Sequence, residues 1–317
     1  MSNSRIPTVS VIIPTFNRSQ TIGRAIQSVL AQTFQDFEII IVDDASTDGT
    51  KTIVEGLCGP LVRYLRHERN QGAAAARNTG ISAAHGIYLA FLDSDDEWLP
   101  EKLSIQVTLL DDQSAGLDLS CSSFILVTNE SEREYIQTAR PDWFKRLLWT
   151  CDLGPGSTLV VRRECADRVG FLDEKLSRLE DWDWLLRLSK KHTIAVVEKP
   201  LSRIHRGPLP CADVIEASMA RFLENHDEDF GLFGWHYRRR VIAKHWAELS
   251  YQFFREKRLL RGGHYLLKAF SVNPLQNPVL LMWLCSAFVD ALLGTSISLW
   301  ALERKHAAGE ALRKLRK

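Results

Sequence analysis

Two apolar segments of this sequence end in clustered aspartates. The pair Asp43-Asp44 follows residues 37–42, and the run Asp-Ser-Asp-Asp at 93–96 follows residues 87–92. Apolar runs of this length are typical of strands buried on both faces of a sheet. Clustered carboxylates are costly there unless a cation joins them, and a divalent metal carrying a phosphate group would neutralise them. The spacing therefore predicts a site for a nucleoside diphosphate and a divalent metal, and with it transfer chemistry.

Asp93 and Asp95 form a D-x-D motif, which has two possible meanings. Hard oxygens this close together bind Mg²⁺ or Mn²⁺, while waters and phosphate oxygens complete the coordination shell. The same spacing occurs in ordinary acidic turns that bind nothing. Its position at the end of a buried strand, with two further aspartates on an earlier strand, favours the metal site.

Polar side chains after the first two strands could contact a nucleoside. Thr15-Phe16-Asn17-Arg18 follows the strand predicted at 9–14, although turns between strands and helices are polar in any such protein. Asp43 and Asp44 are more informative. One of them could cap the next helix, while the other accepts a hydrogen bond from the imide N–H of uracil or from a ribose hydroxyl.

Residues 72–80 open a helix with few side chains, Gly-Ala-Ala-Ala-Ala-Arg-Asn-Thr-Gly. Small residues allow close packing of the backbone, and a helix N-terminus attracts phosphate. Arg77 is the one long cation in this run and could reach a diphosphate. The segment matches neither G-x-G-x-x-G nor a Walker A loop, which argues against dinucleotide and P-loop binding.

Two further sites could take part in chemistry. Glu180 and Asp181 begin a predicted helix, where acids also favour the helix dipole. A carboxylate beside Trp182 would be partly desolvated, which raises its pKa toward the range of a general base. His205 lies between two arginines and could face an anion, supply a neutral nitrogen to a metal, or be structural.

The order of elements indicates how these residues are brought together. Strands predicted at 9–14, 37–42 and 87–92 alternate with helices, which predicts a parallel sheet with right-handed crossovers. In such sheets ligands bind beyond the carboxyl ends of the strands.

From about residue 117 to 210 the pattern is mixed. Residues 157–162 and 194–197 predict strands, and the second of these is followed by a break at Pro200. After about residue 212 the pattern becomes helical. We expect an α/β domain over 1–211, with helices flanking a mostly parallel, Rossmann-like sheet, and a helical C-terminal region over 212–317.

Composition excludes several classes of protein. The chain has 317 residues and a net charge of +1, so nothing in its bulk electrostatics favours nucleic acid. The N-terminus shows no apolar signal segment. The six cysteines form no C-x-x-C pair, which argues against structural zinc and for a reducing compartment. We expect a cytoplasmic protein. The sequence does not indicate an oligomeric state.

Together and in order, these motifs resemble the family 2 glycosyltransferases of the GT-A fold over roughly residues 8–210. The segments that carry the resemblance are 9–17, 32–34, 42–50, 70–72, 75–80, 93–96 and Glu180-Asp181. By resemblance, Thr15 and Asp44 would hold the base. The nucleotide-binding set would be Thr15, Asn17, Asp43, Asp44, Gly72, Arg77, Asp93 and Ser94. The metal ligands would be Asp95, Asp93 and His205, and the base for the acceptor would be Asp181, with Glu180 beside it.

The resemblance implies an inverting transferase that needs Mn²⁺ or Mg²⁺. It would move a sugar from a nucleoside-diphosphate sugar, with uridine diphosphate favoured, to a glycan or glycolipid hydroxyl in the synthesis of cell-surface polysaccharides or glycoconjugates. A nucleotidyltransferase is one alternative, but it would carry a Gly-rich basic loop where this chain has residues 15–18. A non-catalytic sugar-binding relative should lack Asp95 or Asp181, and both are present.

The apolar stretch 279–302 has three possible interpretations. About 24 residues could span a bilayer, but Asp290 lies at its centre, where an acid costs roughly 2.5–3.5 kcal/mol. A buried helical hairpin, peripheral membrane contact through 279–317, and a true span all remain open. With membrane contact, the protein would lie at the cytoplasmic face of the membrane.

Overall fold

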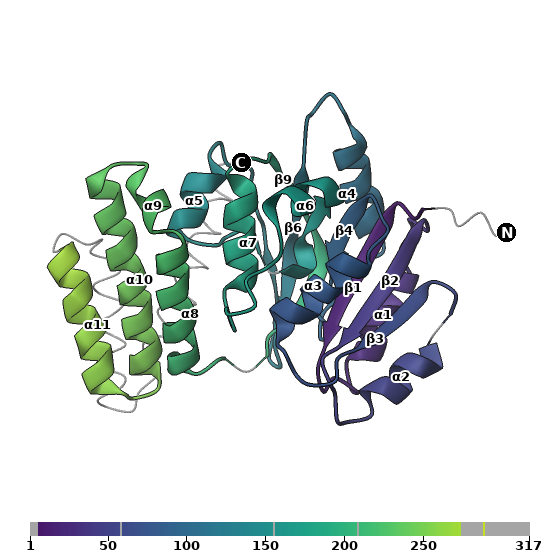
Figure 1. The fold of residues 1–317 in the computed structure, drawn as a ribbon, viewed down its shortest axis with the longest axis horizontal. Helices are drawn as coiled ribbons and strands as arrows, with labels where there is room; N and C mark the ends of the chain where they lie inside the picture. The colour runs from purple at the N-terminus through teal and green to yellow at the C-terminus, as the bar shows by residue number, and fades with distance from the viewer. Residues whose placement is uncertain (1–5, 58, 155, 208, 274–287, 289–317) are drawn as a thin grey trace. The chain divides into compact units, whose positions relative to one another are not determined.

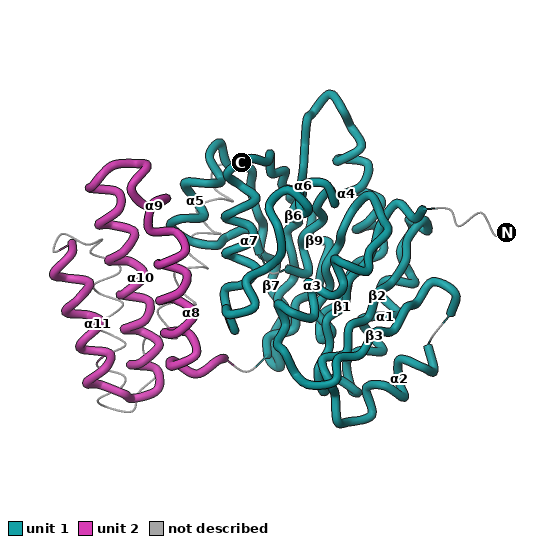
Figure 2. Tube along the Cα trace, viewed as in Figure 1, with its two compact units in different colours: residues 1–208 teal, residues 209–317 magenta. Residues whose placement is uncertain are grey.

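The structure is a computed structural model that describes residues 6–57, 59–154, 156–207, 209–273 and 288 (Figure 1). The chain divides into two compact units, Met1–Pro208 and Leu209–Lys317 (Figure 2). The domain boundary predicted after residue 211 stays a prediction, because compact units need not fold separately.

The first unit is built on a nine-stranded mixed sheet in which four neighbouring strands are parallel. These are β3 (Val62–Arg66), β2 (Phe37–Asp43), β1 (Val9–Thr15) and β4 (Tyr88–Phe91). Since parallel strands end at the same edge, the polar segments after β1, β2 and β4 all lie at one edge. The predicted parallel α/β core is confirmed.

The rest of the sheet mixes the two strand directions. β8 (Val160–Arg162) runs antiparallel to β4, β6 (Leu119–Val127) runs antiparallel to β8, and β9 (Ile194–His205) runs parallel to β6. Two short strands, β5 (Glu97–Trp98) and β7 (Glu132–Tyr135), pair with β9 and β6. The sequence suggested a break at Pro200, but β9 continues through it. Pro200 pairs with Ser123 where the register shifts, so the irregularity accommodates the proline.

Helices cover both faces of the parallel strands. Ile22, Ile26 and Val29 of α1 (Ile22–Leu30) share one fully buried cluster with Val11 and Ile13 of β1. Side chains alternate across a strand, so Ile12 points to the opposite face. On that face lies α3 (Ala73–Ala83), drawn in front of β1 in Figure 1.

The packing of α3 depends on its small residues. A Cβ atom placed on Gly80 would lie 2.4 Å from the Ile12 side chain. Glycine at this position therefore allows the helix to approach the strand closely. The alanine-rich run at 73–76 serves the same close packing, since three of its four residues are buried.

The remaining helices of this unit are α2 (Thr50–Leu57), α4 (Lys102–Asp111), α5 (Trp143–Trp149), α6 (Arg163–Val169) and α7 (Glu180–Ser189), with a short 3₁₀ turn at Gly156–Thr158. The prediction of a strand over 157–162 was therefore wrong at its start. Ser157 and Thr158 are fully buried in that turn, and Ser157 hydrogen-bonds to Asp93 and Asp96 of the neighbouring acidic segment.

The second unit is helical within its described residues. It contains α8 (Ala212–Asn225), α9 (Asp227–Gly231), α10 (Trp235–Arg255) and α11 (Leu259–Val272), and α10 packs against both α8 and α11 (Figure 1). In the part of the chain that the structure describes, no helix combines the length and apolarity needed to cross a membrane. The stretch 279–302 lies outside the described residues, apart from Phe288.

Candidate active site

Asp44 connects the end of β2 to the beginning of α3. Its two carboxylate oxygens accept hydrogen bonds from the backbone N–H groups of Gln71 (2.8 Å) and Gly72 (2.7 Å), and His67 Nδ1 lies 2.8 Å from Oδ1. Gly72 has a φ of +95°, a value that glycine adopts easily. Asp44 is buried, and through these contacts it sets the position of the α3 N-terminus.

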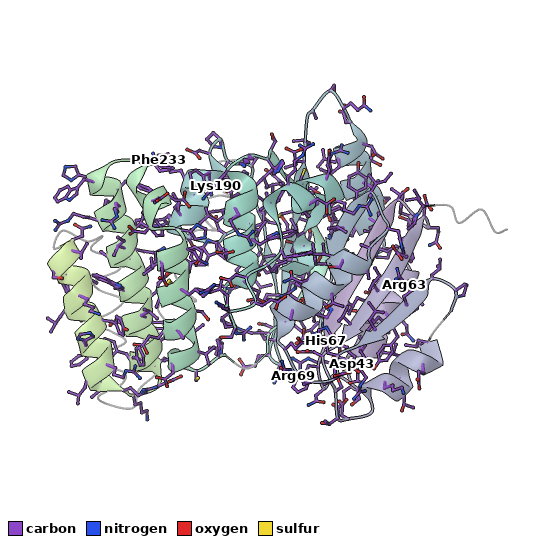
Figure 3. All side chains as sticks on the ribbon, in the orientation of Figure 1. Asp43, Arg63, His67, Arg69, Lys190 and Phe233 are labelled. Atoms are coloured by element: carbon purple, nitrogen blue, oxygen red, sulfur yellow. The ribbon has the colours of Figure 1, made fainter. Side chains whose placement is uncertain are left out.

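Asp43 is fully buried and bound by its own protein. It accepts hydrogen bonds from Ser46 N (2.7 Å) and the Tyr64 hydroxyl, and Arg66 lies 3.5 Å away. Burial and the hydrogen bond to Asp43 raise the pKa of Tyr64 to about 12. Figure 3 shows Asp43 and His67 at the same end of the sheet. Both strand-end aspartates therefore organise the loops around the predicted nucleoside site.

The loop after β1 is held against the loop after β2. Asn17 has a φ of +52°; its side chain accepts a hydrogen bond from Thr47 N (2.8 Å), and its own N–H donates to Ser46 Oγ (2.9 Å). The Thr15 carbonyl accepts from Asp44 N. Thr15 Oγ1, by contrast, is buried without a hydrogen-bond partner among the described residues. A buried hydroxyl in this state is a group that a ligand could satisfy.

Arg77 bridges two acids that are far apart in sequence. Its Nη2 donates to Asp93 (2.7 Å) after β4, and its Nη1 donates to Glu180 (2.7 Å) at the start of α7. Only 6% of Arg77 is exposed. Burial lowers the pKa of Arg77, but the carboxylates of Asp93, Glu180 and Asp181 raise it above its ordinary value. The bridge therefore connects the D-x-D segment to the helix that carries the predicted base.

The run 93–96 is fixed by hydrogen bonds on its buried side. Ser157 Oγ accepts from Asp93 N (3.0 Å) and donates to Asp96 (2.6 Å), which also accepts from His205 N (2.9 Å). Burial, and then the negative charges of Asp93 and Asp95, raise the pKa of Asp96 well above its usual range. Ser94 is buried in the same segment.

Asp95 is partly open, like Asp93 and unlike the buried Asp96. Its side chain is 30% exposed, and one carboxylate oxygen lies 3.4 Å from Arg18. Its backbone carbonyl accepts a hydrogen bond from Arg24 (2.6 Å), which holds the segment in place. A partly open carboxylate beside further hard oxygen atoms fits a divalent cation.

His205 lies close to the acidic run but is engaged elsewhere. Its Nε2 is 3.0 Å from Glu97, and Arg203 lies 3.3 Å from the same carboxylate. Its backbone N–H reaches Asp96. The structure therefore brings His205 to the site and leaves Nδ1 as the ring nitrogen that does not face Glu97.

Asp181 lies on the first turn of α7, next to Glu180. Burial and the Glu180 charge raise its pKa to about 6, against the opposing effect of Arg77. Leu179, just before the helix, has a φ of +67°, a strained value for leucine. The indole N–H groups of Trp182 and Trp184 donate to the Leu147 and Gly170 carbonyls and so hold the helix in place.

Several contacts of the site could not be foreseen from the sequence. Ser157 and His67 stood out in no motif, because their roles depend on segments more than 20 residues away. Asp183, on the same turn as Asp181, pairs with Arg187 (2.9 Å) and is nearly fully buried. Asp183 is therefore structural, and Glu180 is tied to Arg77.

A separate cluster lies at the opposite edge of the sheet. The ligand atoms of Asp118, Cys165 and His192 lie within 4.8 Å of one another. Asp118 precedes β6, which runs in the same direction as β4, so this cluster is at the strand edge away from Asp93. Cys165 Sγ (3.5 Å) and His192 Nδ1 (3.3 Å) both face the Asp118 carboxylate. The cluster plays no part in the site described above.

The fold is of the GT-A type. The structure resembles S. aureus TarS 1–349 in complex with UDP-GlcNAc, with a TM-score of 0.62 and 21% identity over 90% of this chain and 89% of that one. It also resembles the mannosyltransferase PcManGT of Pyrobaculum calidifontis in complex with GDP-Man and Mn²⁺, with a TM-score of 0.52 and 21% identity over 96% and 81% of the two chains. The predicted GT-A fold is confirmed.

Residues 10–168 match the model of glycosyl transferase family 2. The chain belongs to this family, as its motifs predicted. It is 30% identical over 189 residues to the Escherichia coli UDP-Glc:alpha-D-GlcNAc-diphosphoundecaprenol beta-1,3-glucosyltransferase WfgD, covering 60% of this chain and 72% of WfgD.

Two relatives known only as glycosyltransferases are longer than the matched region. The chain is 32% identical over 188 residues to a protein of Haemophilus influenzae and 33% identical over 206 residues to one of Rickettsia felis. These matches cover 57% and 62% of this chain, but only 61% and 32% of the two relatives.

Proposed function

We propose that this protein is an inverting glycosyltransferase that moves a sugar from a nucleoside-diphosphate sugar to an acceptor hydroxyl. The observation that carries the proposal is the Arg77 bridge. This bridge holds Asp93 of the D-x-D run and Glu180, next to Asp181, at the same guanidinium group. The bridge would thereby bring donor-binding and acceptor-activating groups together in one site, as direct displacement at the anomeric carbon requires.

The donor nucleotide would bind at the carboxyl ends of β1, β2 and β4. The unpartnered Thr15 Oγ1 supports a ligand there, and Asp44 is positioned next to it by the Gln71 and Gly72 amides. Asp93 and Ser94 would lie on the ribose side, with Asn17, Asp43, Gly72 and Arg77 shaping the site around the nucleotide. Uridine diphosphate is the nucleotide we favour, and the named substrate of WfgD agrees with it.

Asp95, with Asp93 beside it and His205 nearby, would hold a divalent metal, Mn²⁺ or Mg²⁺. When bound, such an ion neutralises the charge that develops on the leaving diphosphate. The donor set fits this role, because carboxylates are the ligands that these hard cations prefer. The PcManGT complex contains Mn²⁺, which supports the same choice here.

Asp181 would act as the general base. A carboxylate with a pKa near 6 accepts a proton more readily than an ordinary aspartate and is still ionised at neutral pH. It would take the proton of the acceptor hydroxyl as the oxygen attacks the anomeric carbon from the face opposite the diphosphate. Inversion follows from this single displacement.

The acceptor is proposed to be a glycan or glycolipid in the synthesis of a cell-surface polysaccharide. The name of WfgD specifies a sugar on diphosphoundecaprenol as the substrate of that enzyme. A comparable acceptor here would place the protein at the cytoplasmic face of a membrane. Contact through residues 279–317 remains part of this proposal.

The test is a panel of nucleotide sugars incubated with the protein and Mn²⁺, with release of the nucleoside diphosphate as the readout. We expect turnover of a uridine-diphosphate sugar that chelator abolishes. Asp95→Ala should lose this metal-dependent turnover while its circular dichroism spectrum stays unchanged. Full activity of Asp95→Ala in chelator would refute the metal assignment, and turnover of no sugar in the panel would refute the function.

A further inference from the structure

The helical unit contains an open pocket that the proposed reaction does not use. It has a volume of about 740 Å³ and lies where the C-terminal ends of α8 and α11 meet α9 and the first turns of α10. Phe233, labelled in Figure 3, lies in the turn that joins α9 to α10. All lining residues belong to the second unit. This volume falls within the range typical of small-molecule sites.

Aromatic rings form much of the wall. Trp235, Trp246 and Phe230 line the pocket, and Trp235 is 61% exposed even though it is a large apolar residue. The Arg239 guanidinium lies 4.4 Å from the centre of the Trp235 ring and also donates to the Val272 carbonyl. Trp235 is therefore held in place at the pocket while most of its surface stays accessible.

The charged groups of the pocket wall have a net charge of zero. Arg238 and Arg239 face two acids, Glu224 and Asp227, and Asp227 forms an ion pair with Arg238. The Glu224 side chain is exposed. A phosphate or another anion would meet two carboxylates. A lipid chain would cover all four charged groups without replacing their contacts with water.

A neutral saccharide can contact both the aromatic and the charged parts of the pocket wall. Its C–H face can pack against an indole, and its hydroxyl groups can donate to carboxylates and accept from guanidinium groups. Exposed tryptophan together with convergent charged groups of zero net charge matches this ligand better than an anion or a hydrocarbon.

We propose that the pocket between α8, α9, α10 and α11 is a second saccharide-binding site, which takes a neutral sugar portion of the acceptor glycan. The saccharide chemistry follows from the pocket itself, whereas its assignment to the acceptor rests on the proposed function. Such a site would hold the acceptor by sugars remote from the one that reacts.

The test measures binding of neutral tetrasaccharides of glucose, galactose, mannose and N-acetylglucosamine to the full chain, by titration calorimetry without nucleotide or metal. Inorganic diphosphate serves as the charged comparison. We expect at least one tetrasaccharide to bind and diphosphate not to compete with it. Trp235→Ala and Glu224→Ala should each weaken binding at least tenfold. Leu232→Ala is the matched control, because Leu232 is 69% exposed in the adjacent turn and does not line the pocket.

The proposal is overturned if no tetrasaccharide binds, if both pocket variants bind like the wild type, or if diphosphate displaces the sugar. Asp95→Ala separates this proposal from the enzymatic one, since it should keep tetrasaccharide binding while it loses transfer. Sugar binding by a protein that turns over no nucleotide sugar would support the pocket and refute only its link to an acceptor.

Discussion

At the scale of single residues, the site is a set of acids whose properties are set by their neighbours. The sequence indicated which acids gather at the sheet edge, because they directly follow apolar strands. It did not show what each acid contacts. Arg77 and Glu180 are separated by 103 positions, so no local pattern connects them, and the sequence suggested a diphosphate as the partner of Arg77 instead.

Asp181→Asn should reduce sugar transfer by at least about 10²-fold, the contribution expected of a general base. It should leave binding of the nucleotide unchanged in calorimetry. Loss of transfer in Glu180→Gln, together with near-normal transfer in Asp181→Asn, would move the role to Glu180. For the wild type, transfer should fall as the pH drops below about 6, since the base then becomes protonated.

The same pKa has a consequence for stability. The folded pKa of Asp181, about 6, lies above its ordinary value of 3.8, so the folded state binds this proton more tightly than the unfolded state does. The stability that the folded state gains from this bound proton is fully present below pH 3.8 and is lost as the pH rises through 6. Asp181→Asn should therefore raise the free energy of unfolding at pH 8 by about 1–3 kcal/mol, and the gain should vanish at pH 4. An equal gain at both pH values would contradict the assigned pKa.

Arg77→Gln tests whether Arg77 serves to bridge Asp93 and Glu180 or to bind the diphosphate. Loss of the guanidinium leaves Glu180 buried and unpaired, so the free energy of unfolding should fall by about 3–5 kcal/mol. Because Arg77 holds the pKa of Asp181 down, the pH at which the remaining activity is half-maximal should also rise. Arg77→Lys is the control that keeps the charge. A variant of unchanged stability and weaker nucleotide binding would instead support direct contact with the diphosphate.

At the scale of elements, the periodicity of apolar residues predicted the strands and helices that pack through an apolar face. The strands β1, β2 and β4 and the buried face of α1 appear where the apolar residues placed them. The passage of β9 through Pro200 was missed, because it depends on a register shift in its partner β6. The 3₁₀ turn at Gly156–Thr158 was missed for a similar reason, as its hydrogen bonds to residues 93–96 are tertiary.

The contact of α3 with β1 is sensitive to the volume of the side chain at position 80. Gly80→Val would place side-chain atoms where Ile12 already lies, 2.4 Å from the new Cβ. Overpacking of this kind should destabilise the protein by about 1–3 kcal/mol, and denaturant unfolding measures it. Gly56→Val is a control within a helix, because nothing lies within 4 Å of that position. Equal losses in both variants would show that helix propensity, and not packing, is responsible.

At the scale of the whole molecule, each compact unit has apolar contacts of its own. The large buried cluster around Val11 and Ile39 lies entirely within residues 1–208, and a smaller one around Ala247 and Ala269 lies in α10 and α11. Chains built this way often unfold in more than one step. We propose that residues 1–211 and 212–317 act as separate domains, the first binding the nucleotide and the second binding saccharide.

Calorimetric melting tests this division. A ligand that binds one folded domain raises the stability of that domain, by about 2.7 kcal/mol at a free concentration of 100 times its Kd. Uridine diphosphate with Mn²⁺ should therefore raise the midpoint of one transition, and a bound neutral tetrasaccharide should raise the midpoint of the other. Asp95→Ala should remove the first shift and keep the second, and Trp235→Ala should do the reverse. A single transition that both ligands raise together would show that the two units unfold as one domain.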